Sequence, residues 1–196
     1  AGSDAGSIPD VGIVCKGLWK GQEVVGMRVT WDKRYITLGP VCTLLGLAFH
    51  LYDPAGLLGD KKHIGITCAL VPRDTPGAYI GRRHVPLNAM FMNGPTRGQE
   101  VFMPLDYVIG GPGMVGQGWR MLMESLAAGR SISLPSSNAG MAQLTARTVG
   151  GYARVRSQFK MAIGRFEGVE EPLTRIGAYT YMMDAVRKMT AGAIDL

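Results

Sequence analysis

The sequence predicts an α+β fold, with an antiparallel β-barrel or sandwich over residues 1–110 followed by helices over residues 111–196. Short apolar segments separated by glycine or proline fill the first hundred residues, and the apolar spacing becomes helical after Gly118. Glycine and proline, 28 and 11 of 196 residues, exceed average usage and favour a turn-rich architecture over a helical bundle.

The first predicted elements form a β-hairpin. Apolar and polar residues alternate over Val11–Trp19 and again over Glu23–Trp31, with Lys20-Gly21-Gln22 as the turn between them. Val41–Leu51 and Ile64–Val71 are continuous apolar runs, a pattern typical of strands buried on both faces. The remaining candidate strands are Tyr35–Leu38, Tyr79–Val85 and Gln99–Pro104.

Three helices are expected in the second part. The first starts at Trp119 and ends at the Ala-Ala-Gly-Arg stretch over 127–130, the second covers 141–159, and the third covers 169–183. The helical pattern is still running at Leu196, and the first residue is Ala1 rather than methionine. We therefore expect a piece of a longer protein whose second domain is incomplete.

Composition excludes several classes. The net charge of +6 suits phosphate-bearing ligands, but the basic residues occur singly or in pairs, which argues against nucleic-acid binding. The three cysteines show no metal-ligand spacing to a histidine and indicate reduced thiols in a cytoplasmic protein without a bound metal. The longest apolar run, Val41–Leu51, is too short for a membrane span.

The segment Gly111–Gly116 formally matches the dinucleotide-binding pattern G-x-G-x-x-G. That pattern requires a parallel strand after the helix and an acidic residue about 20 positions on. Residues 131–139 hold no acid, and more helix follows. A nicotinamide oxidoreductase is therefore disfavoured, and an antiparallel sheet would exclude it.

Tyr35 and Thr37 are two residues apart on a predicted strand, so their side chains share one face and suit a planar ligand. An ordinary pair on a sheet surface gives the same pattern. Ser3 lies in a glycine-flanked turn that suits an anion, or is a plain surface turn. Arg130 and Arg156 are phosphate binders or solvated cations near helix ends.

Eight strings, in this order, resemble acyl-CoA dehydrogenases over essentially the whole chain. The strings are Ala1-Gly2-Ser3-Asp4, Lys33-Arg34-Tyr35-Ile36-Thr37, Asp74-Thr75-Pro76-Gly77, Thr96-Arg97-Gly98, Val108-Ile109-Gly110, Gly116-Gln117-Gly118-Trp119, Gly129-Arg130 and Tyr152–Phe159. The resemblance is closest to the long bacterial FadE-type enzymes. It implies that residues 1–110 are the family's middle β domain and residues 111–196 the start of its C-terminal helical domain, with FAD bound between the two.

The resemblance assigns roles to three residues of the first domain. Ser3 matches the serine of the A-G-S-D turn, which lies beside the flavin and the thioester end of the substrate. Tyr35 stands where most members carry tryptophan against the flavin ring, and Thr37 matches the threonine whose hydroxyl reaches the flavin N5 and O4 edge. Leu38 replaces a common asparagine.

Three residues of the second part receive roles in the same way. Arg130 matches an arginine of the substrate-pocket helix near the acyl-CoA. Arg156 and Phe159 match the R-x-x-F motif, which in the family contacts the FAD of a neighbouring subunit. Lys160 replaces the glycine that often follows this phenylalanine.

The implied activity is the FAD-dependent α,β-dehydrogenation of fatty acyl-CoA thioesters to trans-2-enoyl-CoA in fatty acid β-oxidation. The implied partners are acyl-CoA, an electron-transfer acceptor and further copies of the chain. The family's catalytic glutamate would lie beyond residue 196, so the chain alone is expected to bind FAD weakly or not at all and to be inactive. The alternatives are an acyl-CoA oxidase of the same fold and a non-catalytic β-sandwich binding module, which Tyr35 and Thr37 facing a sealed core would favour.

Overall fold

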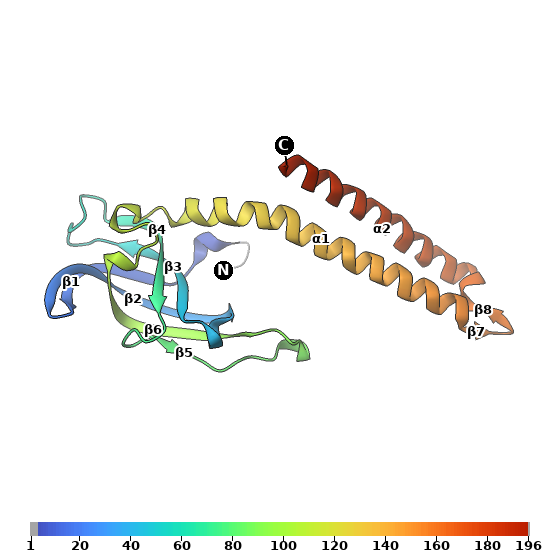
Figure 1. Ribbon diagram of the computed structural model, residues 1–196, viewed down its shortest axis with the longest axis horizontal. Coiled ribbons are helices and arrows are strands. Elements are labelled where there is room, and N and C mark those ends of the chain that lie inside the picture. Colours follow the sequence, from blue (N-terminus) through green and yellow to red (C-terminus); the bar gives the residue numbers. More distant parts are fainter. Residues whose placement is uncertain (1–3, 196) are drawn as a thin grey trace. The chain divides into compact units, whose positions relative to one another are not determined.

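A computed structural model describes residues 4–195. The chain divides into two compact units after Leu122, within one long helix, whereas the sequence analysis places the domain boundary after Gly110. The first unit contains a six-stranded sheet, and the second contains a pair of helices with a small hairpin (Figure 1).

The predicted hairpin is confirmed. Strand β1 (Val11–Trp19) pairs antiparallel with β2 (Gln22–Thr37), which joins two predicted strands into one. Lys20 and Gly21 form the two-residue turn, and both have positive φ, at 50° and 82°. This backbone matches the twist of the paired strands, and glycine adopts it at no steric cost.

The predicted α+β class is confirmed, but the prediction of an antiparallel barrel or sandwich is corrected, because the described strands form a mixed sheet with no closed barrel. Its order is β4-β3-β1-β2-β6-β5, with β4 and β5 at the ends. Strand β1 pairs antiparallel with β2 on one side and parallel with β3 on the other. The other strands are β3 (Leu44–Tyr52), β4 (His63–Pro72), β5 (Tyr79–Ile80) and β6 (Asn93–Pro104). The 3-10 helices are η1 (Ala5–Ser7), η2 (Gly39–Val41), η3 (Pro86–Asn88), η4 (Leu105–Tyr107), η5 (Pro112–Met114) and η6 (Ile163–Arg165).

The core lies against one face of the sheet and includes Met27, Phe49 and Met103, each fully buried. Strand β3 alternates between buried and exposed residues, so its predicted burial on both faces is wrong. Strand β4 is buried on both faces over residues 66–69, as predicted. The second face of β4 meets the start of the long helix, where a Cβ on Gly118 would lie 2.7 Å from the Ile66 carbonyl oxygen.

Over residues 111–195, two α-helices form instead of the predicted three. Helix α1 (Gly118–Val155) runs through residues 127–130, and α2 is Glu167–Ile194. Alanine and arginine in the predicted break are strong helix formers, and Pro135 removes only one backbone hydrogen bond from a 38-residue helix. Strands β7 (Ser157–Gln158) and β8 (Met161–Ala162) form the hairpin between the helices.

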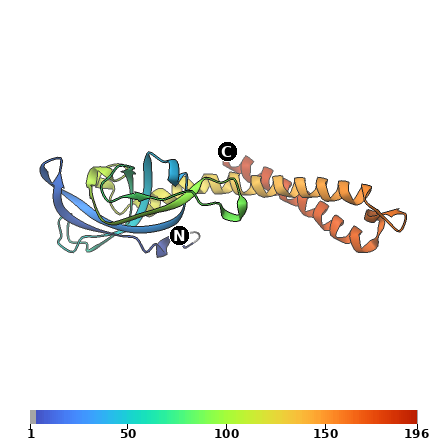
Figure 2. The ribbon, with the colours of Figure 1, turned by 90° about the horizontal axis from the view of Figure 1, so that it is seen from below.

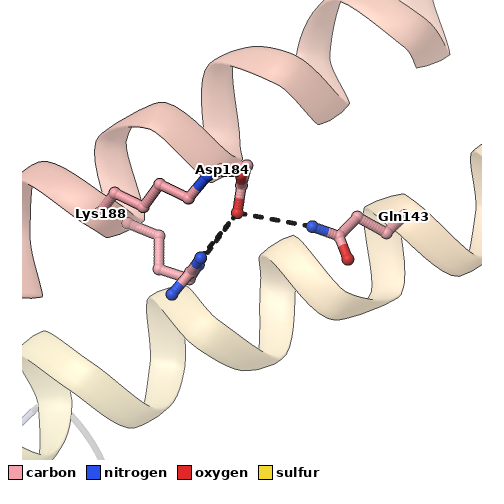
Figure 3. A network of polar contacts seen from close by, with 4 residues as sticks. Gln143, Asp184 and Lys188 are labelled. Carbon is pink, nitrogen blue, oxygen red and sulfur yellow. Dashed lines mark hydrogen bonds and ion pairs between the residues drawn. The ribbon is translucent and has the colours of Figure 1, made fainter.

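Helix α2 folds back along α1, as both ribbon views show (Figures 1 and 2). The Asp184 carboxylate of α2 accepts hydrogen bonds from Gln143 of α1 at 3.4 Å and from Arg187 at 2.8 Å, and it pairs with Lys188 at 2.9 Å (Figure 3). Hydrogen bonds from Lys188 and Arg187 lower the pKa of Asp184. Over residues 4–195, no helix is both long and apolar enough to cross a membrane.

A buried carboxylate organises the loop between β3 and β4. Asp53 is fully buried, and its two oxygens accept hydrogen bonds from the backbone N–H groups of Leu57 at 3.0 Å and Leu58 at 2.7 Å. Burial acts to raise the pKa of Asp53, but the hydrogen bonds from Leu58, Leu57 and Gly56 outweigh it and lower this pKa.

We predict that Asp53→Asn lowers the free energy of unfolding by about 1–3 kcal/mol, because the amide N–H₂ would face backbone donors. The folded-state pKa of Asp53 is lowered, so its contribution is present above the ordinary aspartate pKa and is lost as the pH falls through the folded-state value. Urea unfolding should therefore show the largest difference from the unmodified chain at neutral pH and a smaller one in acid. Asp60→Asn, at an exposed position in the same loop, is the control and should change little.

Candidate functional site

A β-bulge in β2 sets the orientation of the predicted ligand-facing residues. The pairing of β2 with β6 shifts between Lys33 and Ile36, so that residues 34 and 35 both stand opposite Pro95. Proline has no N–H to donate to the ladder, and bulges are among the few places where a sheet tolerates it. The bulge therefore occurs where the partner strand cannot supply a normal pair.

The bulge reverses which residues of β2 face the core. Trp31 is buried with 2% of its surface exposed, and Ile36 also packs against the core. Uninterrupted alternation from Trp31 would place Tyr35 and Thr37 inside. Instead, the Tyr35 side chain is 58% exposed and Thr37 is exposed as well. The two residues share an outer face, and the sealed-core arrangement that would favour a non-catalytic binding module is not observed.

Two neighbours hold the Tyr35 ring. The Arg34 guanidinium lies 5.1 Å from the ring centroid, and the His84 ring meets Tyr35 edge-on at 5.3 Å with an interplanar angle of 70°. The His84 backbone N–H donates to the Asn93 carbonyl oxygen at 2.8 Å, which fixes the segment carrying the imidazole to β6. These contacts orient the aromatic ring while leaving much of its surface open.

A pocket of about 360 Å³, lined mainly by charged residues, adjoins this ring. Its lining residues are Asp32, Arg34, His84, Pro95 and Arg97. The Arg97 Nε donates to the Asp32 carboxylate at 3.1 Å, so one of the two arginine charges is offset by an acid. The remaining positive charge and the unused guanidinium donors suit an anionic group such as a phosphate.

Sequence reasoning missed His84 and Arg97 as parts of this surface. His84 lies in a connecting segment and Arg97 in β6, about 50 to 60 residues from Tyr35. The residue spacing around them therefore does not indicate that they lie beside Tyr35. Ser3, predicted to share the site, lies outside the described residues. Its assignment stays a prediction.

Arg130 lies in α1 and lines a mostly apolar pocket of about 420 Å³ between the two helices of the second unit. The other lining residues are Leu134, Pro135, Asn138, Met182, Met183, Val186 and Arg187. The exposed Arg130 thus places a cation beside an apolar groove, an arrangement that suits an amphipathic ligand.

Arg156 and Phe159 lie at the hairpin after α1. Arg156 donates its backbone N–H to the Tyr152 carbonyl oxygen at 2.9 Å, and the Phe159 side chain is 89% exposed. Continuous helix from residue 130 to residue 155 separates them from Arg130 by roughly 37 Å, at 1.5 Å per residue. A ligand in contact with both Arg130 and Phe159 of the same chain would have to span roughly this distance.

The glycine-rich segment Gly111–Gly116 forms η5 and the turn that precedes α1. Its strand neighbours form a mixed, mainly antiparallel sheet rather than the parallel sheet of a dinucleotide-binding fold. The parallel strands that the dinucleotide-binding pattern requires are therefore not found beside this segment in the described sheet. Across residues 4–195, no cluster of three or more histidine, cysteine, aspartate or glutamate side chains is placed to hold a metal ion.

Comparisons with known proteins agree with this architecture of a β unit followed by antiparallel helices. The family model of the acyl-CoA dehydrogenase C-terminal domain matches residues 116–195. A probable acyl-CoA dehydrogenase, FadE10 of Mycobacterium tuberculosis, is 29% identical over 164 residues, 83% of this chain and 24% of that protein. A protein named HemX from Proteus mirabilis is 56% identical over 103 residues, 53% of this chain and 61% of that protein.

Among solved structures, an acyl-CoA dehydrogenase from Bacillus anthracis, complexed with FAD, superposes with a TM-score of 0.72 at 19% identity, over 97% of this chain and 30% of that one. This likeness shows a shared fold over nearly the whole of this chain. Residues 116–195 thus match the C-terminal domain of acyl-CoA dehydrogenases, and most of the chain is similar to proteins of that name. The chain spans 61% of the HemX protein and about a quarter of FadE10.

Two departures from the family pattern occur at strained backbone positions. Leu38, where asparagine is common, has φ 58°, and Lys160, where glycine often occurs, has φ 63°. Asparagine and glycine adopt this left-handed region at lower cost than leucine or lysine. The asparagine and glycine that the resemblance implies at these two places would suit this backbone conformation better than the residues present.

We predict that Leu38→Asn raises the free energy of unfolding by about 1 kcal/mol, because the left-handed conformation costs an ordinary side chain roughly that much. Lys160→Gly should raise it by a few tenths to about 1 kcal/mol, because the freedom of glycine in the unfolded chain offsets part of the gain. Urea titration measures both. Leu44 is exposed to a similar degree, 53% against 56% for Leu38, but it lies in a regular strand. A stabilising Leu44→Asn would contradict this explanation.

Proposed function

We propose that this chain forms the flavin-facing β wall and two helices of an FAD-dependent acyl-CoA dehydrogenase that oxidises fatty acyl-CoA thioesters to trans-2-enoyl-CoA. When bound, FAD supplies the acceptor for the hydride that leaves the substrate. The chain's own residues bind and orient the reactants. The single observation that carries the proposal is the β2 bulge, which exposes Tyr35 and Thr37 together on one face.

The exposed residues fit a flavin chemically. The open surface of the Tyr35 ring offers a stacking partner for a planar aromatic system, and Arg34 and His84 limit the ring's freedom to turn. The Thr37 hydroxyl, on the same face, can donate to or accept from a polar ring edge. The adjoining pocket with Arg34 and Arg97 suits a phosphate group of the same dinucleotide or of coenzyme A.

The second unit supplies two further contacts in this proposal. Arg130 and its apolar groove would receive part of the acyl-CoA, which combines a charged head with an apolar tail. Arg156 and Phe159 would contact the FAD of a neighbouring copy, in agreement with their separation from Arg130 along α1. The working protein is then a homo-oligomer in the cytoplasm that passes electrons to a separate acceptor. An acyl-CoA oxidase would use the same residues and differ in whether oxygen reaches the reduced flavin.

We predict that the chain binds FAD weakly and that Tyr35→Ala lowers the affinity roughly fivefold, because a stacked aromatic pair contributes about 1 kcal/mol. Tyr35→Trp should tighten binding because its stacking surface is larger. Quenching of flavin fluorescence on titration with each variant measures these affinities. Tyr79→Ala is the matched control, since Tyr79 is 56% exposed against 58% for Tyr35. Equal effects of the two alanine variants would refute the assignment of this face.

The same proposal predicts no turnover by the chain alone. The resemblance matches none of its residues to the carboxylate that removes the proton next to the thioester carbonyl. Incubation with FAD, an acyl-CoA series and a dye acceptor should therefore leave the dye oxidised. Dye reduction that depends on acyl-CoA would show that a carboxylate of this chain serves as the base.

A further inference from the structure

Two of the three histidines lie side by side away from the proposed flavin face. His50 is on β3 and His63 is at the start of β4, the neighbouring antiparallel strand. The His50 Nδ1 and the His63 Nε2 are 3.3 Å apart, and the ring planes are inclined by 45°. Without a metal, a single proton shared between these nitrogens forms a hydrogen bond.

The same separation matches a metal-bound pair. Two imidazole nitrogens bound to one tetrahedral ion at 2.0–2.1 Å are about 3.3–3.4 Å apart. Imidazole is a preferred ligand of zinc, nickel and copper ions. We propose that His50 and His63 form a two-histidine site for a divalent transition-metal ion, with Zn²⁺ and Ni²⁺ as the probe ions.

The surroundings of both rings support this role. The His50 Nε2 lies 3.0 Å from the Gly6 carbonyl oxygen, which can only accept, so this nitrogen carries the proton and leaves Nδ1 free as a ligand. Metal-binding histidines characteristically donate their second ring N–H to a carbonyl or carboxylate in this way. Tyr52 stacks on His63 with ring centroids 4.6 Å apart and planes 19° apart, which restricts the second imidazole.

The site is open to solvent. His63 is exposed and His50 is half-buried, and β4 is an end strand of the sheet. Among residues 4–195, no third histidine, cysteine, aspartate or glutamate completes a larger cluster. Water would therefore fill the remaining coordination positions, and the ion would exchange readily.

Metal occupancy would also act on the segment before β1. A metal on Nδ1 requires the proton to stay on Nε2, so the bond to Gly6 is enforced. The His50 backbone N–H also donates to the Asp10 carbonyl oxygen at 2.9 Å, so one residue holds the segment at two points. A bound ion would reduce opening of residues 5–10, which begin two positions after Ser3 in the sequence.

The test is isothermal titration of the chain, free of any polyhistidine tag, with ZnCl₂ and NiCl₂ under a non-chelating reductant. The proposal requires one ion per chain and a loss of affinity of at least tenfold in both His50→Gln and His63→Gln. His84→Gln is the matched control and should bind like the unmodified chain. Circular dichroism confirms that each variant is folded. Hydrogen–deuterium exchange of residues 5–10 should slow on adding Ni²⁺ to the unmodified chain and to His84→Gln, and should be unchanged in His63→Gln.

The proposal fails if the chain shows no saturable binding. It fails equally if folded His63→Gln binds as tightly as the unmodified chain, or if His84→Gln weakens binding to the same extent. Binding that disappears only when Cys15 and Cys42 are replaced by serine would place the ion at the thiols and also overturn it. None of these readouts depends on flavin binding, so they separate the metal site from the proposed enzymatic role.

Discussion

The β2 bulge opposite Pro95 is the constraint on which the functional face depends. Up to Trp31, β2 presents its large apolar residues to the core, and past the bulge it presents Ile36 inward instead. Because side chains alternate along a strand, one extra residue exchanges the two faces for everything that follows. The aromatic and hydroxyl side chains at the end of β2 therefore face outward rather than into the core.

The region around this bulge is also firmly anchored. The buried Asp10 carboxylate forms an ion pair with the partly buried Lys33, and the Asp32 backbone N–H donates to the same carboxylate at 3.2 Å. A buried pair of this kind is a poor source of net stability, but removing one partner is costly, so the pairing specifies one arrangement. The contacts to Asp10 fix β2 at residues 32 and 33, before the bulge. Pairing with β6 fixes β2 at residues 36 and 37, after the bulge.

The sequence predicted much of this molecule because most of its signals are local. The period of the apolar residues located the strands, and Lys20-Gly21 marked the hairpin turn. The long helix was misread at residues 127–130, since a glycine within good helix formers does not end a helix without a competing cap. The two-residue spacing predicted that Tyr35 and Thr37 share one face of the strand. The spacing did not predict whether that face points to the core or to solvent. That direction depends on Pro95, sixty residues away, whose pairing no local pattern reveals.

The hairpin after α1 bears on how the chain meets other molecules. Phe159 projects into solvent from a two-residue turn, and its ring rests edge-on against Phe166 at 6.3 Å. A side chain that is already held in place loses little conformational entropy on association. More of the free energy gained by burying its apolar surface therefore contributes to affinity. The same preorganisation keeps the apolar Phe159 side chain exposed to solvent when no partner is present. At high concentration, the exposed Phe159 side chain promotes self-association of the chain. The solubility of the chain then reports whether a partner covers Phe159.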